Sequence, residues 1–167
     1  MLQHKGKEKL KVSLPEDHLG YWLRYVSNNV AYALSQKLED SGVTVAEWIV
    51  LRQMYLKNWV SPMSLAIQTG LTQGAISKLI DRLLKKKFVT KKVSKHDHRY
   101  KEIKLTSVGR KIVPRLASIA DENDDYFFGK LSSAKKKQLM SFFIGVVKIN
   151  RFRKSLNMRV NADDKIF

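Results

Sequence analysis

Between Gln73 and Arg82, side chains that can hydrogen-bond a nucleic acid recur at helical spacing. Glutamine can form two hydrogen bonds with adenine, arginine and lysine suit guanine or phosphate, and serine can bond either. If the apolar residues of this segment face inward, the outward positions are Gln73, Gly74, Ser77, Lys78, Asp81 and Arg82. The pattern favours a helix that contacts nucleic acid, and the competing interpretation is an ordinary solvated helix face.

A second candidate site lies at Asp97 and Arg99, between two strand-like runs. An acidic residue opposes anion binding in so basic a segment, but Asp97 can hold the Arg99 guanidinium through paired hydrogen bonds. An arginine aimed in this way from a hairpin tip suits a narrow minor groove, where the potential is most negative. The simpler alternative is that Asp97 only makes the turn.

The charge of the chain points to a polyanionic partner. Residues 61–110 contain twelve Lys or Arg and three acidic residues, a net charge of +9, and the 167-residue chain carries +17. So large a charge opposes compactness and is most simply explained by a partner such as DNA, although a merely soluble basic protein is the alternative. The absence of cysteine excludes disulfides, thiolate metal sites and thiol redox sensing.

The membrane and secretory classes find no support in the sequence. The longest apolar run, residues 142–147, is far too short to span a bilayer. The lysine-rich start of the chain is not followed by the apolar core of a secretory signal. We therefore expect a cytoplasmic protein with no membrane partner.

Helix start signals and apolar periodicity predict six helices and one hairpin. The start signals are the Thr44–Glu47 capping box, Ser61 before Pro62, Thr72, Thr106 and Ser132. Glycines at 42 and 70 can end the first and third helices. We expect helices over about 15–40, 45–57, 62–69, 73–86, 107–130 and 133–150, with strands over 89–93 and 102–105. Pro114 should kink the fifth helix by removing one backbone hydrogen bond.

The fold class predicted is all-α with a small β-wing, a winged helix-turn-helix with six helices and a dimer formed through the terminal helices. The two terminal helical regions carry apolar faces broader than one small winged domain can cover, which favours packing on a second subunit over packing within one domain. The expected organisation is a flexible basic arm (1–14), dimerisation helices (15–42 and 107–150), a DNA-binding domain (43–106) and a basic C-terminal tail (151–167).

From about residue 19 to residue 150, the sequence resembles the MarR/SlyA family of bacterial winged-helix transcription regulators. Three motifs carry the resemblance. The first comprises Gly42, Val43, Thr44, Trp48, Ile49, Val50 and Leu51. The second comprises Leu65, Ala66, Gly70, Leu71, Thr72, Ala75, Ile76, Ser77, Ile80, Asp81, Arg82 and Leu83. The third and most specific comprises Asp97, Arg99, Leu105, Thr106 and Gly109.

The resemblance implies a homodimer on duplex DNA, at an inverted repeat whose half-sites lie about one helical turn, roughly 34–36 Å, apart. The fourth helix would enter the major groove and the wing arginine the minor groove. The DNA-binding residues carried over are Thr72, Gln73, Gly74, Ser77, Lys78, Arg82, Asp97 and Arg99. The chain departs from the family at Lys87, where a glycine is usual, and at Val93, Ser94 and Lys95, where an acid or proline is common.

Many members of that family are released from DNA by a small phenolic or other aromatic effector. The first two helices are rich in aromatic residues, namely Tyr21, Trp22, Tyr25, Tyr32, Trp48 and Tyr55. These rings are compatible with an effector pocket, but core packing and dimer contacts are the favoured interpretation for each ring taken alone.

Other classes of site find little support. His96 and His98 flank Asp97, but two histidines and one acid match none of the usual metal-ligand spacings, so no metal and no cofactor are expected. The chain contains no glycine-rich phosphate loop, no G-x-S-x-G elbow and no zinc-protease helix, so no enzyme is expected. The acidic cluster Asp121, Glu122, Asp124 and Asp125 is most simply a solvated face, and Lys135 to Lys137, nearby or across the dimer, are its candidate partners. The main alternative function is a sequence-tolerant architectural or silencing-antagonist DNA-binding protein.

Overall fold

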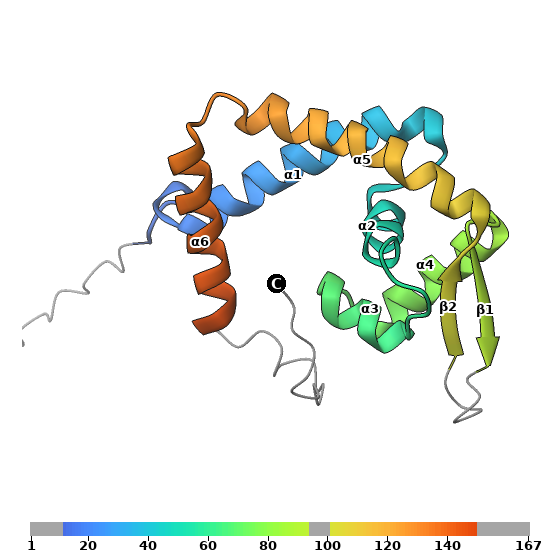
Figure 1. The fold of residues 1–167 in the computed structure, drawn as a ribbon. Helices are drawn as coiled ribbons and strands as arrows, with labels where there is room; N and C mark the ends of the chain where they lie inside the picture. The colour runs from blue at the N-terminus through green and yellow to red at the C-terminus, as the bar shows by residue number, and fades with distance from the viewer. Residues whose placement is uncertain (1–11, 94–100, 150–167) are drawn as a thin grey trace, which may run out of the picture.

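The computed structural model of the chain describes residues 12–93 and 101–149. Within these ranges it contains six α-helices and a two-stranded antiparallel sheet (Figure 1). The elements are α1 (Leu19–Leu38), α2 (Val45–Met54), α3 (Pro62–Thr69), α4 (Gln73–Lys85), β1 (Val89–Val93), β2 (Lys101–Leu105), α5 (Ser107–Phe128) and α6 (Ser133–Ile149). The predicted fold class of six helices with a small β-wing is confirmed.

The predicted helix starts are confirmed by hydrogen bonds from backbone N–H groups to side-chain caps. The Glu47 N–H donates to Thr44 Oγ1 at 3.3 Å, and the Thr44 N–H donates to Glu47 Oε2 at 2.9 Å, which completes the capping box. Ser61 caps α3, Thr72 caps α4 and Thr106 caps α5 in the same manner. These caps satisfy N–H groups that have no partner inside their helices.

Several boundaries differ from the sequence prediction. The first predicted helix is shorter, because 3-10 turns occupy Pro15–Asp17 and Glu39–Ser41 at its two ends. The second helix ends at Met54 rather than near residue 57. Gly42 and Gly70 adopt φ values of +64° and +71°, the left-handed conformation that ends the preceding turns as predicted. Pro114 lies inside α5 as predicted, and the kink expected there stays a prediction.

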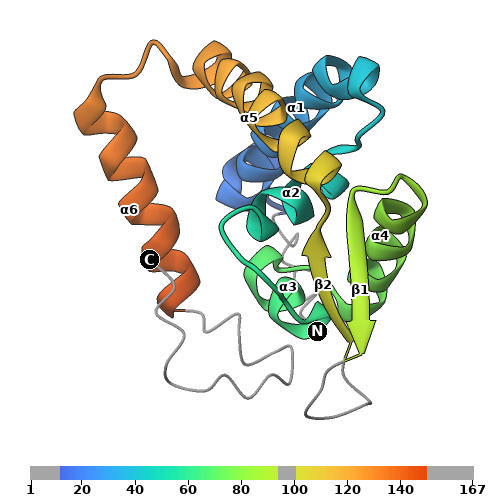
Figure 2. The same ribbon diagram turned by 45° about the vertical axis from the view of Figure 1, so that its right-hand side comes forward.

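The core of the winged part lies between α2, α3, α4 and one face of the sheet (Figure 2). Val89 pairs with Leu105 across the two strands, and the apolar side chains of Val89, Ile103 and Leu105 are buried in the core. Val60, just before α3, adds an antiparallel bridge to Ile103 on the other side of β2. The hairpin is therefore fixed at its base by a third segment of chain.

The remaining helices extend away from this core. α5 packs along α1, and Figures 1 and 2 show α6 at the opposite end of the molecule from the hairpin. Several large apolar side chains on these helices are exposed to solvent. Leu19, at the start of α1, is 80% exposed, and Ile149, at the end of α6, is 81% exposed. No helix in residues 12–93 and 101–149 has the length and apolar character needed to cross a membrane.

Candidate nucleic-acid interface

Helix α4 is strongly divided into a buried face and an exposed face. Its apolar side chains Ile76, Leu79, Ile80 and Leu83 are all buried in the core. The N-cap and the five α4 residues predicted to bind DNA are all exposed: Thr72, Gln73, Gly74, Ser77, Lys78 and Arg82. The sequence prediction of which side faces outward is therefore correct, and α4 is held by one face while the other is free to meet a partner.

Spacing of four residues sorts the exposed side chains into two adjacent rows, because residues i and i+4 lie one above the other on a helix. Gly74, Lys78 and Arg82 form one row, and Gln73, Ser77 and Asp81 form the other. The first row borders a groove of about 480 Å³ that runs between α4 and the start of α2, where Ala46 forms the opposite wall. The groove thus combines two cations with a glycine that leaves the backbone uncovered.

Gly74 has open space on its outward side. A Cβ atom built at this position meets no atom within 4 Å. Nothing inside the protein therefore requires a glycine here, in contrast to Gly109, whose Cβ would lie 2.0 Å from the Phe88 carbonyl oxygen. The absence of a side chain at Gly74 is consistent with close approach of an external partner to the helix backbone.

The C-terminal end of α4 is closed by a Schellman motif. The Phe88 N–H donates to the Leu83 carbonyl and the Lys87 N–H to the Leu84 carbonyl, each at 3.0 Å. Lys87 is the residue in the left-handed conformation, with φ of +59°. The turn therefore keeps the geometry that a glycine would allow, although the side chain at this position is a lysine.

A buried ion pair fastens the same end of α4 to α2. The Lys86 ammonium lies 2.7 Å from Glu47 Oε2 and donates a second hydrogen bond of 2.7 Å to the Gly42 carbonyl. Glu47 is fully buried, whereas the Lys86 side chain is 34% exposed. These contacts fix the end of α4 relative to α2 and to Gly42, which lies in the connection between α1 and α2. The capping box was visible in the sequence, but the pairing with a residue 39 positions later was not.

The hairpin carries a basic outer face built around Trp59. The Lys92 ammonium lies 4.1 Å from the centre of the Trp59 ring, and the Lys104 ammonium lies 5.6 Å from it. Lys92 also forms an ion pair of 3.2 Å with Glu102. Sequence reasoning did not single out Trp59, since its position beside the sheet follows from the bridge between Val60 and Ile103.

The Leu105–Thr106–Gly109 motif forms the joint between the hairpin and α5. The Thr106 hydroxyl donates to the Lys87 carbonyl at 2.7 Å and accepts from the Gly109 N–H at 3.0 Å. The Thr106 N–H donates to the Phe88 carbonyl at 3.0 Å. Because a side chain at Gly109 would collide with this same carbonyl, the motif serves the packing of α5 against the end of α4.

The proposed wing residues Asp97 and Arg99 lie outside the described residues, as do His96 and His98. The basic arm up to residue 11 and the tail from residue 150 lie outside them as well. Within residues 12–93 and 101–149, no three His, Asp or Glu side chains gather in a way that could hold a metal ion.

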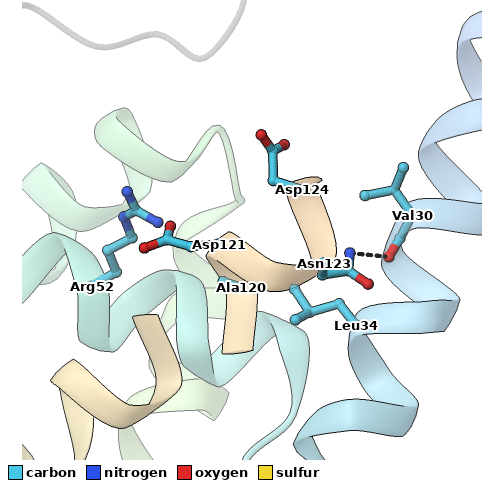
Figure 3. A pocket seen from close by; sticks show the side chains of 7 residues that line it. All are labelled: Val30, Leu34, Arg52, Ala120, Asp121, Asn123 and Asp124. Atoms are coloured by element: carbon cyan, nitrogen blue, oxygen red, sulfur yellow. Dashed lines mark hydrogen bonds between the residues drawn. The ribbon is translucent and has the colours of Figure 1, made fainter. Parts of the chain in front are cut away.

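A separate cavity of about 420 Å³ lies between α1, α2 and α5 (Figure 3). It is lined by Val30, Leu34, Arg52, Ala120, Asp121, Asn123 and Asp124. None of the six aromatic residues proposed for an effector pocket lines it. Trp48 is buried in the core, while Trp22, Tyr25 and Tyr32 are exposed on α1. All four acidic residues of the predicted solvated face are exposed, which confirms that prediction, and Asp121 and Asp124 also border this cavity. Among the described residues, Asp125 pairs with Lys136 at 3.9 Å.

Comparison with known proteins gives consistent results. A family model described as the MarR family matches residues 41–99. The chain is 26% identical over 141 residues to the HTH-type transcriptional regulator SarZ of Staphylococcus haemolyticus, covering 84% of this chain and 95% of that protein. Among solved structures, a MepR–DNA complex from S. aureus is 26% identical with a TM-score of 0.73, covering 78% of this chain and 97% of MepR.

A third match concerns the fold alone. The structure of CouR from Rhodococcus jostii RHA1 bound to p-coumaroyl-CoA superimposes with a TM-score of 0.72, at 21% identity, over 81% of this chain and 95% of CouR. The similarity spans nearly the full length of each of these relatives, so it includes helices on both sides of the winged core.

Proposed function

We propose that this chain, which belongs to the MarR family of transcription regulators, acts as a homodimer that recognises an inverted-repeat operator in duplex DNA. In this proposal residues 43–106 form the DNA-binding domain, whereas residues 15–42 and 107–150 form the dimer. Two α4 helices would occupy successive major grooves on one side of the duplex, with their centres about one helical turn apart, roughly 34–36 Å.

The observation that carries the proposal is the free outer face of α4. The helix is anchored by four buried apolar residues and presents Gln73, Ser77, Lys78 and Arg82 to the outside. Gln73 and Ser77 lie near the capped N-terminus, where the helix dipole also favours the approach of phosphate. We assign base contacts to Gln73 and Ser77, and base or phosphate contacts to Lys78 and Arg82. Thr72 and Gly74 would bring the helix start against the DNA backbone.

The wing would supply the second contact. Arg99, supported by Asp97, is proposed to enter the minor groove beside the half-site read by α4. Lys92 and Lys104 on the outer face of the hairpin would bind the flanking phosphates, where they add affinity without sequence information. The solved structure of the relative MepR is a complex with DNA, which supports DNA binding by this fold.

Dimerisation is supported by the apolar surface of α1 and α6. Leu23 and Val26 on α1 are about half exposed, as are Phe142, Phe143 and Val147 on α6. No described residue of α6 is buried. An isolated helix gains stability chiefly by covering such a face, so a second copy of the chain is the proposed cover.

The cavity between α1, α2 and α5 is the proposed effector site. It joins the two functional parts, since α2 belongs to the winged domain while α1 and α5 belong to the dimerisation helices. A ligand seated there would contact both parts at once and so favour one relative orientation of the two α4 helices over another. CouR, a fold relative, holds a small molecule in its structure.

The alternative function is a sequence-tolerant DNA-coating protein driven by the net charge of +17. Two measurements separate the proposals. Sedimentation equilibrium of the full chain should give the mass of a dimer, and competition binding should give a preference of at least about a thousandfold for the selected operator over random duplex. A monomer with equal affinity for all sequences would support the coating protein instead.

A further inference from the structure

The cavity between α1, α2 and α5 contains a buried hydrogen-bond acceptor without a partner. Asn123 on α5 is 2% exposed, and its Nδ2 donates to the Val30 carbonyl on α1 at 3.2 Å (Figure 3). This bond fixes the amide orientation, because the opposite orientation would set two oxygens against each other. Asn123 Oδ1 is then left without a hydrogen-bond partner among the described residues. A buried polar atom in this state calls for a further partner, such as a water molecule, an ion or a ligand group.

Two carboxylates line the same cavity. Asp121 and Asp124 lie on either side of Asn123 in sequence, and neither forms an ion pair with a described residue. Arg52 is the one cation of the lining, and its guanidinium lies over the Trp48 ring at 5.6 Å from the ring centre. The lining therefore has one negative charge in excess, in a protein whose net charge is +17.

The rest of the lining is apolar. Val30 and Leu34 on α1 and Ala120 on α5 form a partly buried wall next to these polar groups. A ligand that matches the cavity thus needs a small apolar body, a hydrogen-bond donor for Asn123 Oδ1 and a positive charge near the carboxylates. An anionic ligand would find one guanidinium, but it would face two carboxylates and an acceptor that it could not satisfy.

From this arrangement we propose that the cavity binds a small organic cation, a primary amine on an apolar or aromatic body, in preference to an anionic phenolic acid. The proposal rests on the effector site proposed above and specifies its ligand class. The ammonium would donate to Asn123 Oδ1 and be held by Asp121 and Asp124, while the apolar body would lie against Val30, Leu34 and Ala120.

Three probes with one phenol ring test the charge preference directly. Tyramine carries an ammonium, tyrosol a hydroxyl and 4-hydroxyphenylacetate a carboxylate on nearly the same scaffold. Isothermal titration calorimetry on the full chain without DNA should rank tyramine first and 4-hydroxyphenylacetate last. The test is stringent because the overall positive charge attracts the anion, so a preference for the amine has to come from the cavity.

Asparagine substitutions remove the charge of an aspartate but keep its side-chain shape, so they test whether the carboxylates cause the preference for tyramine. The double variant Asp121→Asn/Asp124→Asn should weaken tyramine binding about three- to tenfold, the sum expected for two partly solvated charge pairs. Glu122→Gln is the matched control, since it removes one charge from the same acidic run but does not line the cavity, and it should leave binding unchanged. Thermal unfolding of each variant verifies that the fold is retained.

Three results would overturn the proposal: tighter binding of 4-hydroxyphenylacetate than of tyramine, tyramine affinity unaffected by the double variant, or no binding of any probe up to about 10 mM. DNA affinity is measured separately on the same protein. Failure of the amine preference with intact operator binding would reject the ligand class alone, whereas loss of sequence-selective DNA binding would reject the regulator itself.

Discussion

The Lys86 ammonium lies 2.7 Å from Glu47 Oε2 and joins the end of α4 to the start of α2. Burial of the Glu47 carboxyl would by itself raise its pKa, but the hydrogen bond from Lys86 and those from Thr44 outweigh burial and hold the pKa below its ordinary value. One carboxylate therefore caps α2, pairs with α4 and remains ionised inside the protein. The same carboxylate therefore links the start of α2 to the end of the proposed reading helix.

Replacing Glu47 with glutamine should lower the free energy of unfolding at neutral pH by about 2 kcal/mol, because the Lys86 ammonium loses its charged partner while the amide keeps the shape of the side chain. The Glu47 pKa is depressed in the folded state, so the contribution of the carboxylate is complete above its unfolded pKa of about 4.3 and is lost as pH falls through the folded value. Urea unfolding at several pH values measures this difference.

The stability gap between wild type and Glu47→Gln should accordingly shrink only in the acid range. Glu39→Gln, at an exposed position with no described ion pair, is the control and should change stability by less than about 0.5 kcal/mol. A gap that stays constant down to the lowest pH at which the protein remains folded would contradict the assignment of the effect to the ionised carboxylate.

The single methyl group added by Gly74→Ala should change protein stability and DNA affinity in opposite directions. The added methyl group meets no protein atom, and alanine favours the helix over glycine, so the free protein should become more stable by about 0.5 kcal/mol. On the proposed interface the same methyl group would stand between the α4 backbone and DNA. Operator affinity should therefore fall while the melting temperature rises, and unchanged operator affinity would remove Gly74 from the contact surface.

Lys87→Gly should stabilise the protein by about 1 kcal/mol, because a lysine at φ of +59° is strained where a glycine is not. Denaturant unfolding measures the change. Lys85→Gly, two residues earlier and still within α4, should instead destabilise by about 1 kcal/mol. If both substitutions destabilise equally, the left-handed conformation of Lys87 is not a source of strain.

Trp59→Leu should weaken DNA binding through the lysines that it positions. Loss of the ring frees Lys92 and Lys104, so the dependence of log affinity on log salt should become shallower by about 1, the equivalent of one phosphate contact. Trp59→Phe keeps a ring and should retain most of the slope. A parallel loss of affinity at every salt concentration in Trp59→Leu would indicate a purely structural role.

Local signals explain how much of the fold the sequence predicted. Capping residues and left-handed glycines act within a few residues of themselves, so the starts at Thr44, Ser61 and Thr72 and the stops at Gly42 and Gly70 were all found correctly. The outward face of α4 followed from the positions of its four buried apolar residues. These predictions needed no knowledge of which elements touch.

Contacts between distant residues were beyond the reach of the sequence. The bond from Lys86 to Glu47, the ring of Trp59 beneath two lysines and the collision that requires Gly109 all depend on how separate elements meet. The aromatic residues of the first two helices are compatible with an effector pocket in the sequence, but none of them lines the cavity proposed as the effector site, which is lined in part by Asp121, Asn123 and Asp124 on α5. Asn123 and Val30 meet across this site although they lie 93 positions apart, and no local periodicity reveals such a contact.

Base reading by paired α4 helices is the central claim, and selection of bound sites from a random duplex pool tests it most directly. The full chain should enrich an inverted repeat with half-site centres about one helical turn apart, and Gln73→Ala should lose preference at specific positions of each half-site. A bound pool that keeps the base composition of the starting pool, for wild type and variant alike, would contradict the account.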